Sequence, residues 1–206
     1  MMDAQADPAY GRTNWRRFAL AAGIPTVVAG GMLFGMANGA FAASFAVSGQ
    51  DFKISADRLE GDGFAQYGGV VKDANGKAIP VALAGIRNAT LVNLCQSVRV
   101  KDAPMSLTIN AGGEKGKPAR ATNLLIGMKD LAGDAEFTNI NIGQDAGTLR
   151  SGGPEARGET GGFGQQADQV TITGLRQTAV STTAGTFTLT GLNLRLNFGS
   201  QPKECF

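Results

Sequence analysis

The segment Val170-Thr171-Ile172-Thr173-Gly174-Leu175 alternates apolar residues with small polar ones, and a close copy, Phe187-Thr188-Leu189-Thr190-Gly191-Leu192, follows it. An alternating pattern of this kind is typical of a β-strand with one buried and one exposed face. Looser copies begin at Ala89 and at Phe137, with uneven spacing. Uneven copies favour long strands in a curved sheet or a β-sandwich, and a β-solenoid, which needs a regular period, remains the alternative.

The same two-residue period recurs along most of the chain after Phe45, and no long helical pattern competes with it. Asn75-Gly76 has the composition of a hairpin turn, and Pro80 predicts that the returning strand lies at a sheet edge. The sequence therefore predicts an all-β domain. Its expected inward-facing rows are Phe52, Ile54 and Ala56; Met105, Leu107 and Ile109; Leu124, Ile126 and Met128; and Leu192, Leu194, Leu196 and Phe198.

An uncharged run extends from Phe18 to the residue before Asp51, directly after Arg16 and Arg17. Residues 18–39 are long and apolar enough for a membrane-spanning helix, and the arginines before them predict a cytoplasmic N-terminus. We expect a stub over residues 1–14, a signal-anchor helix or signal peptide over residues 15–43, and an exported domain over residues 44–206. A secreted form, cleaved near Ala42 or Ala43, is the alternative.

Three glycines in the apolar run, Gly31, Gly35 and Gly39, are four residues apart. On a helix they share one stripe, where the absence of side chains allows a second helix to approach closely. They predict a helix-packing face, with a membrane-protein partner or a second copy of the chain as its occupant.

The charges of the exported part nearly cancel. The whole chain carries 19 basic and 17 acidic residues, and three of the arginines precede the apolar run. A near-neutral surface with scattered charges argues against nucleic acid as a partner.

Cys95 and Cys205 are the only cysteines, and both follow the apolar run. In an oxidising compartment, two thiols most simply form one disulfide, and this one would fix the C-terminal end of the chain. Free or intermolecular thiols are the alternative.

Residues 143–168 interrupt the strand pattern with many glycines and mixed charges. Loops of this length are usually functional or disordered. Phe163, between two glycines, is a candidate recognition residue, and the alternative is that its ring attaches the loop to the body of the domain.

Candidate catalytic groups are scarce. The sequence has no histidine and no G-x-S-x-G motif, so neither a Ser-His-Asp triad nor a Cys-His pair is possible. We expect no cofactor and no metal, and the balance favours a protein that is not an enzyme.

Several segments resemble an actinomycete (Streptomyces-type) family of exported proteins of unknown function, whose members often carry the label cholesterol esterase. They are residues 42–50, 64–69, 94–97, 137–146, 163–168 and 203–206, and the likeness extends from Trp15 to Phe206. The resemblance implies export and suggests lipid or sterol ester chemistry, but the label brings no catalytic residues with it.

Phe52-Lys53-Ile54-Ser55-Ala56-Asp57-Arg58-Leu59 is similar to the opening strand of periplasmic lipid-bridge proteins of the lipopolysaccharide transport type. Those proteins are folded-over sheets with an apolar groove. The likeness implies a slot for acyl chains or a terpenoid, and the alternative is an ordinary filled core. The slot would be lined by Phe52, Ile54, Leu124, Ile126, Leu192 and Leu194.

Together these observations predict a non-enzymatic cell-envelope protein outside the cytoplasm, held at the membrane by its N-terminal helix. It would bind a lipid, a terpenoid or an envelope partner. A lipid or sterol esterase and a structural surface or assembly module are the alternatives.

Overall fold

A computed structural model describes residues 50–100 and 104–206 of the chain. The predicted stub, the predicted anchor helix with Gly31, Gly35 and Gly39, and the cleavage site all lie outside the described residues. Within these two ranges, no helix is both long enough and apolar enough to cross a membrane.

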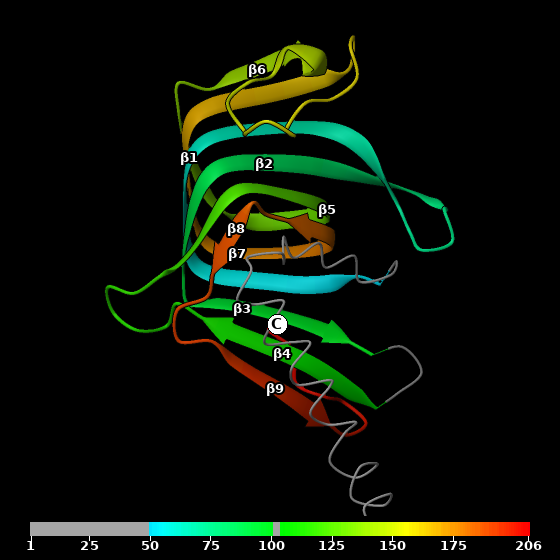
Figure 1. The fold of residues 1–206 in the computed structure, drawn as a ribbon, viewed down its shortest axis with the longest axis vertical. Helices are drawn as coiled ribbons and strands as arrows, with labels where there is room; N and C mark the ends of the chain where they lie inside the picture. Colours follow the sequence, from blue (N-terminus) through cyan, green and yellow to red (C-terminus); the bar gives the residue numbers. More distant parts are fainter. Residues whose placement is uncertain (1–49, 101–103) are drawn as a thin grey trace, which may run out of the picture. The chain divides into compact units, whose positions relative to one another are not determined.

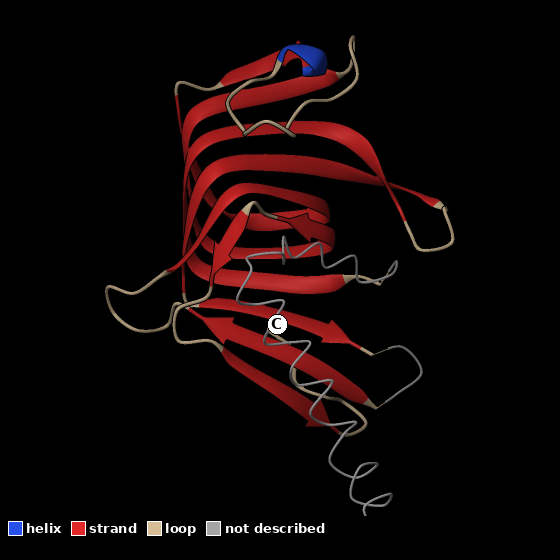
Figure 2. Ribbon diagram, viewed as in Figure 1, coloured by secondary structure: helices blue, strands red, loops and turns tan. Residues whose placement is uncertain are grey.

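The described part is built almost entirely from antiparallel strands, with one short 3-10 turn (Figure 2). All-β architecture is therefore confirmed. The elements are β1 (Phe52–Lys72), β2 (Ala78–Val92), β3 (Leu94–Arg99), β4 (Met105–Ala111), β5 (Ala119–Thr138), β6 (Asn141–Asp145), η1 (Ala146–Thr148), β7 (Phe163–Thr183), β8 (Thr186–Thr188) and β9 (Asn193–Phe198).

The four longest strands form a ring in which every strand pairs with two others. β1 pairs with β2, β2 with β5, β5 with β7, and β7 again with β1 (Figure 1). The register shows how strongly the strands are staggered. Ala65 lies opposite Gln166 of β7 on one side, whereas the path through β2 and β5 reaches the same strand at Thr183. A closed sheet requires tilt and stagger of this kind.

The ring encloses the main hydrophobic core. Its inner residues are nearly all aliphatic or aromatic and come from every strand of the ring, for example Phe64, Ile86, Leu124 and Leu175. Register shifts between β5 and β7 bend these long strands around the core. The sheet is single and antiparallel, so neither the two stacked sheets of a sandwich nor the parallel coils of a solenoid occur among the described residues.

Three shorter strands, β3, β4 and β9, extend the sheet beyond the ring, and we call them the wing. β3 continues from β2 along the same side of β1, but it pairs with β4 instead of β5. The change of partner occurs at Asn93, which has a positive φ of 53° and donates a backbone hydrogen bond to Gly112. Gly112 also has a positive φ, and a Cβ there would clash with backbone atoms of Leu91 and Ala119.

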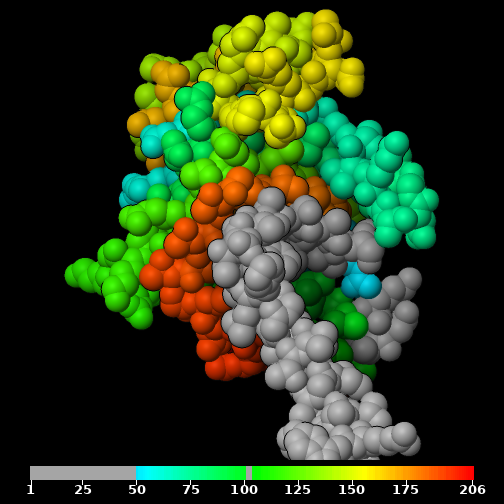
Figure 3. All heavy atoms as spheres, in the orientation of Figure 1, coloured from blue at the N-terminus to red at the C-terminus, as the bar shows by residue number. Residues whose placement is uncertain are grey.

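The connections follow the sequence prediction in part. The hairpin turn at Asn75-Gly76 is confirmed, and Pro80 lies where β2 pairs with β1 but not with β5. The irregular segment is shorter than the predicted 143–168 stretch, because β6 ends at Asp145 and β7 begins at Phe163. Leu149 and Ala156 of this segment are buried against Tyr67, so the segment, coloured yellow in Figure 3, packs onto the ring.

Candidate functional site

The wing has one apolar face and one polar face, because successive side chains of a strand point to opposite sides. On the apolar side, Met105 lies opposite Phe198, Leu107 opposite Leu196, and Ile109 opposite Leu194. Val98 and Gln96 of β3 lie next to Leu107 and Ile109 and complete the surface. We call this set the apolar face: Gln96, Val98, Met105, Leu107, Ile109, Leu192, Leu194, Leu196 and Phe198.

The outer row of the apolar face is exposed. Phe198 is 74% exposed, Leu194 59%, Leu192 55% and Leu196 50%. Single exposed apolar residues are common, whereas contiguous exposed apolar rows are typical of interaction surfaces. The sequence pattern predicted an inward-facing row here, and the structure shows that this prediction is wrong, because β9 is the outer strand of the wing.

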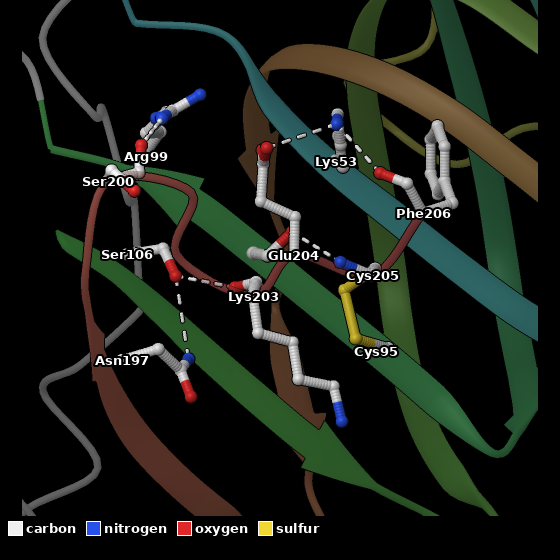
Figure 4. A network of polar contacts seen from close by, with 11 residues as sticks. Lys53, Cys95, Arg99, Ser106, Asn197, Ser200, Lys203, Glu204, Cys205 and Phe206 are labelled. Carbon is white, nitrogen blue, oxygen red and sulfur yellow. Dashed lines mark hydrogen bonds and ion pairs between the residues drawn. A yellow bond between two sulfur atoms is a disulfide. The ribbon is translucent and has the colours of Figure 1, made fainter. Parts of the chain in front are cut away.

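The C-terminal tail, residues 200–206, covers the part of the wing's polar face that Ser97 and Ser106 form (Figure 4). Ser106 is fully buried and donates its hydroxyl hydrogen to the carbonyl oxygen of Lys203 over 2.5 Å. Ser97, also buried, accepts a hydrogen bond from the Cys205 backbone N–H at 3.0 Å. These two serines therefore lie beneath the tail and form hydrogen bonds with its backbone groups.

A disulfide between Cys95 of β3 and Cys205 fastens the tail, as the sequence predicted. Beyond it, Lys53 of β1 donates to the carbonyl oxygen of Phe206 and forms an ion pair with Glu204. The Phe206 ring also lies within cation-π distance of the Lys53 ammonium group. The tail is thus attached to both the wing and the ring. Its contacts lie on the polar side of the wing and leave the apolar face free of the tail.

The apolar face continues the inner surface of the ring. Phe52 of β1 lies opposite Val98 on one side and Ala179 of β7 on the other. Directly opposed residues of antiparallel strands point to the same side. One row therefore runs from Leu196 through Leu107 and Val98 to Phe52, and exposure falls along it from 50% to 1%.

The six residues of the predicted slot do not come together. Phe52, Ile54, Leu124 and Ile126 belong to the ring core, whereas Leu192 and Leu194 lie on the wing. The void beside Ile54, Leu124 and Ile126 measures only about 10 Å³, so side chains fill the ring. The open groove that the likeness to lipid-bridge proteins implied is therefore not found inside the ring, where side chains fill the space between the strands.

Two buried polar side chains interrupt the ring core. Gln177 and Thr182 both border the small void, and neither the Gln177 Nε2 nor the Thr182 Oγ1 has a hydrogen-bond partner. An unsatisfied buried polar group costs about 1–3 kcal/mol. These two groups therefore lower the stability of the ring.

The remaining surface features are polar or isolated. A cleft of about 620 Å³ lies beside the tail, and its lining mixes acidic Asp57 and Glu204 with basic Arg176 and Lys203. Phe163, the candidate recognition residue, begins β7 opposite Asp145 of β6 and is 65% exposed. Among the described residues, no group of three or more His, Cys, Asp or Glu side chains has metal-binding geometry.

The Tyr67 hydroxyl of β1 is a titratable group in a partly buried environment. Burial raises the pKa of the Tyr67 hydroxyl above its ordinary value, and the negative charge of Glu155 adds to this effect. Tyr67 packs against the irregular segment and donates a hydrogen bond to the Glu155 carbonyl oxygen. Its environment is therefore that of a structural contact.

Sequence reasoning assigned Leu192 and Leu194 to an apolar site, but it placed that site in an internal slot and not on the wing. The alternation in Leu192 to Phe198 was visible, but no local signal shows which of two alternating faces lacks cover. The roles of Ser97 and Ser106 were also missed, since small polar residues in strands are common and only the folded tail distinguishes them.

The comparisons with known proteins give one match. A model for a family of unknown function matches residues 48–206, which include every described strand. No curated protein and no solved structure matches the chain.

Proposed function

The chain belongs to this family of unknown function, DUF6230, and we propose that it is a non-enzymatic cell-envelope protein that binds an apolar partner through the wing. The observation that carries the proposal is the exposed row of Leu194, Leu196 and Phe198 on β9, with the exposed Leu192 just before it. The tail is fastened to the reverse side of the wing.

The architecture suits a binding surface better than a carrier cavity. A pocket for a lipid or terpenoid measures several hundred cubic ångströms, whereas the void in the ring measures about 10 Å³. An apolar molecule or protein segment therefore has its best site outside the ring, on the apolar face. The disulfide and the tail's hydrogen bonds fasten the reverse side of that face, and a surface that is ordered before binding loses less entropy on binding.

The side chains of this protein give little support for a catalytic function. The chain has no histidine, and the two buried serines, Ser97 and Ser106, bind backbone groups of the tail. A sterol esterase needs a nucleophile beside a base. We therefore propose a binding function without catalysis, and we do not adopt the label cholesterol esterase that members of the similar family carry.

We place this activity outside the cytoplasm. The disulfide supports an oxidising compartment, and the apolar run before the described residues supports export. Attachment through that run, or secretion after its cleavage, would both leave the wing in the same compartment.

A site-specific crosslink tests the proposal. A photoreactive benzoylphenylalanine is placed at Leu196 in the full chain, and the cells that make the protein are irradiated. The matched control carries the same group at Ile142, which is 63% exposed but lies outside the wing. We expect an adduct at Leu196 that is missing at Ile142 and is lost when Leu194→Asp is added.

The identity of the adduct is read by mass spectrometry. Equal adducts at Leu196 and Ile142, or no adduct at Leu196, would contradict the proposed function, because a binding face must have a neighbour that a random exposed site lacks.

A further inference from the structure

We propose that the partner of the apolar face is a lipid bilayer, with the outer row of β9 lying at the boundary between headgroups and acyl chains. The inference rests on the proposed function and names the partner of the same site. Three properties of the face support it: its chemistry, its size and its position in the chain.

The chemistry of the face suits lipid. Eight of its nine side chains are apolar and the ninth is the neutral Gln96. Charged residues of these strands point elsewhere: Arg195 alternates with Leu194 and Leu196 and so lies on the polar face, where the Thr108 hydroxyl contacts its backbone. Because charged groups are costly in the acyl region, an uncharged face is the kind of surface that a bilayer accepts.

The size of the face argues against a second copy of the chain. A standard protein interface uses about 20–30 residues on each side. The apolar face offers nine, of which Val98, Met105, Leu107 and Ile109 are only partly exposed. A dimer through this face alone would therefore be too weak to persist.

A lipid contact of the same size needs only one additional attachment. An interfacial apolar surface binds a bilayer reversibly by itself and firmly when a second anchor holds it there. The order of the chain supplies such an anchor. Phe52, the first residue of β1, lies beside Val98 of the wing, so the polypeptide enters the domain at the inner end of the apolar face.

The distance from the anchor to the wing is short. If residues 18–39 span the membrane, as the sequence predicts, about ten residues connect them to the domain, and these reach at most roughly 35 Å when extended. In that case the first residues of β1 can lie no farther than this from the bilayer, and Val98 of the wing is beside them. The exported polypeptide thus carries its apolar face where lipid is the most abundant apolar partner.

Tryptophan quenching by brominated lipids tests this arrangement in the full chain. Trp15 is the only tryptophan, so Trp15→Phe gives a background without this fluorophore. Phe198→Trp then reports from the wing, and Leu194→Trp reports from a second position on the same face. Phe163→Trp is the matched control, because Phe163 is similarly exposed but lies on β7 outside the wing. Each protein is reconstituted into phosphatidylcholine vesicles.

We expect lipid brominated near the top of its acyl chains to reduce the fluorescence of both wing reporters at least about two-fold, with little change at the control. Lack of quenching at both wing positions, or equal quenching at the control, would overturn the lipid inference. A protein adduct at Leu196 combined with unquenched wing reporters would keep the proposed function and reject the bilayer as partner. Absence of both signals would reject the function as well.

Discussion

Removal of the disulfide is expected to be the most informative change to the stability of this domain. The perturbation is the double replacement Cys95→Ala and Cys205→Ala, which leaves every other tail contact possible. The cysteines are 110 residues apart in the sequence. In the chain-entropy model, a crosslink that closes a loop of this length stabilises the folded state by about 4–5 kcal/mol.

The structure shows why most of this loss should come from the unfolded chain. Without the disulfide, the tail still has its hydrogen bonds to Ser97 and Ser106, each contributing about 0.5–1.5 kcal/mol. The partly exposed Lys53 to Glu204 ion pair adds at most about 1 kcal/mol. The folded tail therefore stays docked, while the unfolded chain gains freedom and exposes more surface.

Urea unfolding of the two forms measures both effects. We expect the free energy of unfolding to fall by about 4–5 kcal/mol and the denaturant slope to rise, because the uncrosslinked unfolded chain exposes more surface. The control is Ser106→Ala, which removes one tail hydrogen bond and keeps the disulfide. It should lose only about 1–3 kcal/mol, with an unchanged slope. A smaller loss in the double variant than in the control, or an unchanged slope, would refute this reasoning.

Three further predictions concern the ring. Gln177→Leu should raise the free energy of unfolding by about 1 kcal/mol, since it removes an unsatisfied buried amide, and a decrease would show that the amide has a partner in solution. Gly63→Ala should cost at least about 1–2 kcal/mol, because Gly63 has a φ of +73° and a Cβ would meet the Ser151 carbonyl oxygen. Gly68→Ala, where a Cβ meets nothing, should be neutral or slightly stabilising, and similar losses at both positions would contradict the steric argument. Stability should fall as the pH rises past the ordinary tyrosine pKa of 10.0, because the folded state keeps the Tyr67 proton longer than the unfolded state does; Tyr67→Phe should reduce this loss in unfolding measurements between pH 9 and 11, and an identical pH profile would refute it.

The strands could be predicted because their signal is local. Phe52 and Ile54 alternate with the polar Lys53 and Ser55. Leu124 and Ile126 follow the same two-residue period, although Leu125 between them is also apolar, and all four are buried. The pairing of β1 with β7 could not be predicted, because the register between strands at opposite ends of the domain is set by the whole ring. A sandwich and a closed ring use the same alternating strands, and only the partners differ.

Prediction of the candidate site from the sequence has the same limit. Alternation correctly assigned Leu194, Leu196 and Phe198 to one side of a strand, but it cannot show what lies opposite that side. Their exposure follows from the place of β9 at the outside of the wing and from the tail, which covers the other face. Both depend on contacts between segments far apart in the sequence. The disulfide was predictable because only one intramolecular pairing of two cysteines exists.

The closure of the ring also sets the order in which this protein can fold. β1 is the first long strand to be synthesised and β7 is the last, yet they share one of the longest pairings in the sheet. Contacts between such distant segments form slowly, because the loss of chain entropy comes before any gain. Until β7 has been made as far as Ala179, the side of β1 that pairs with it has no partner strand. Closure of the ring therefore has to wait for β7, and completion of the wing has to wait for β9 and the tail, which follow β7 in the chain.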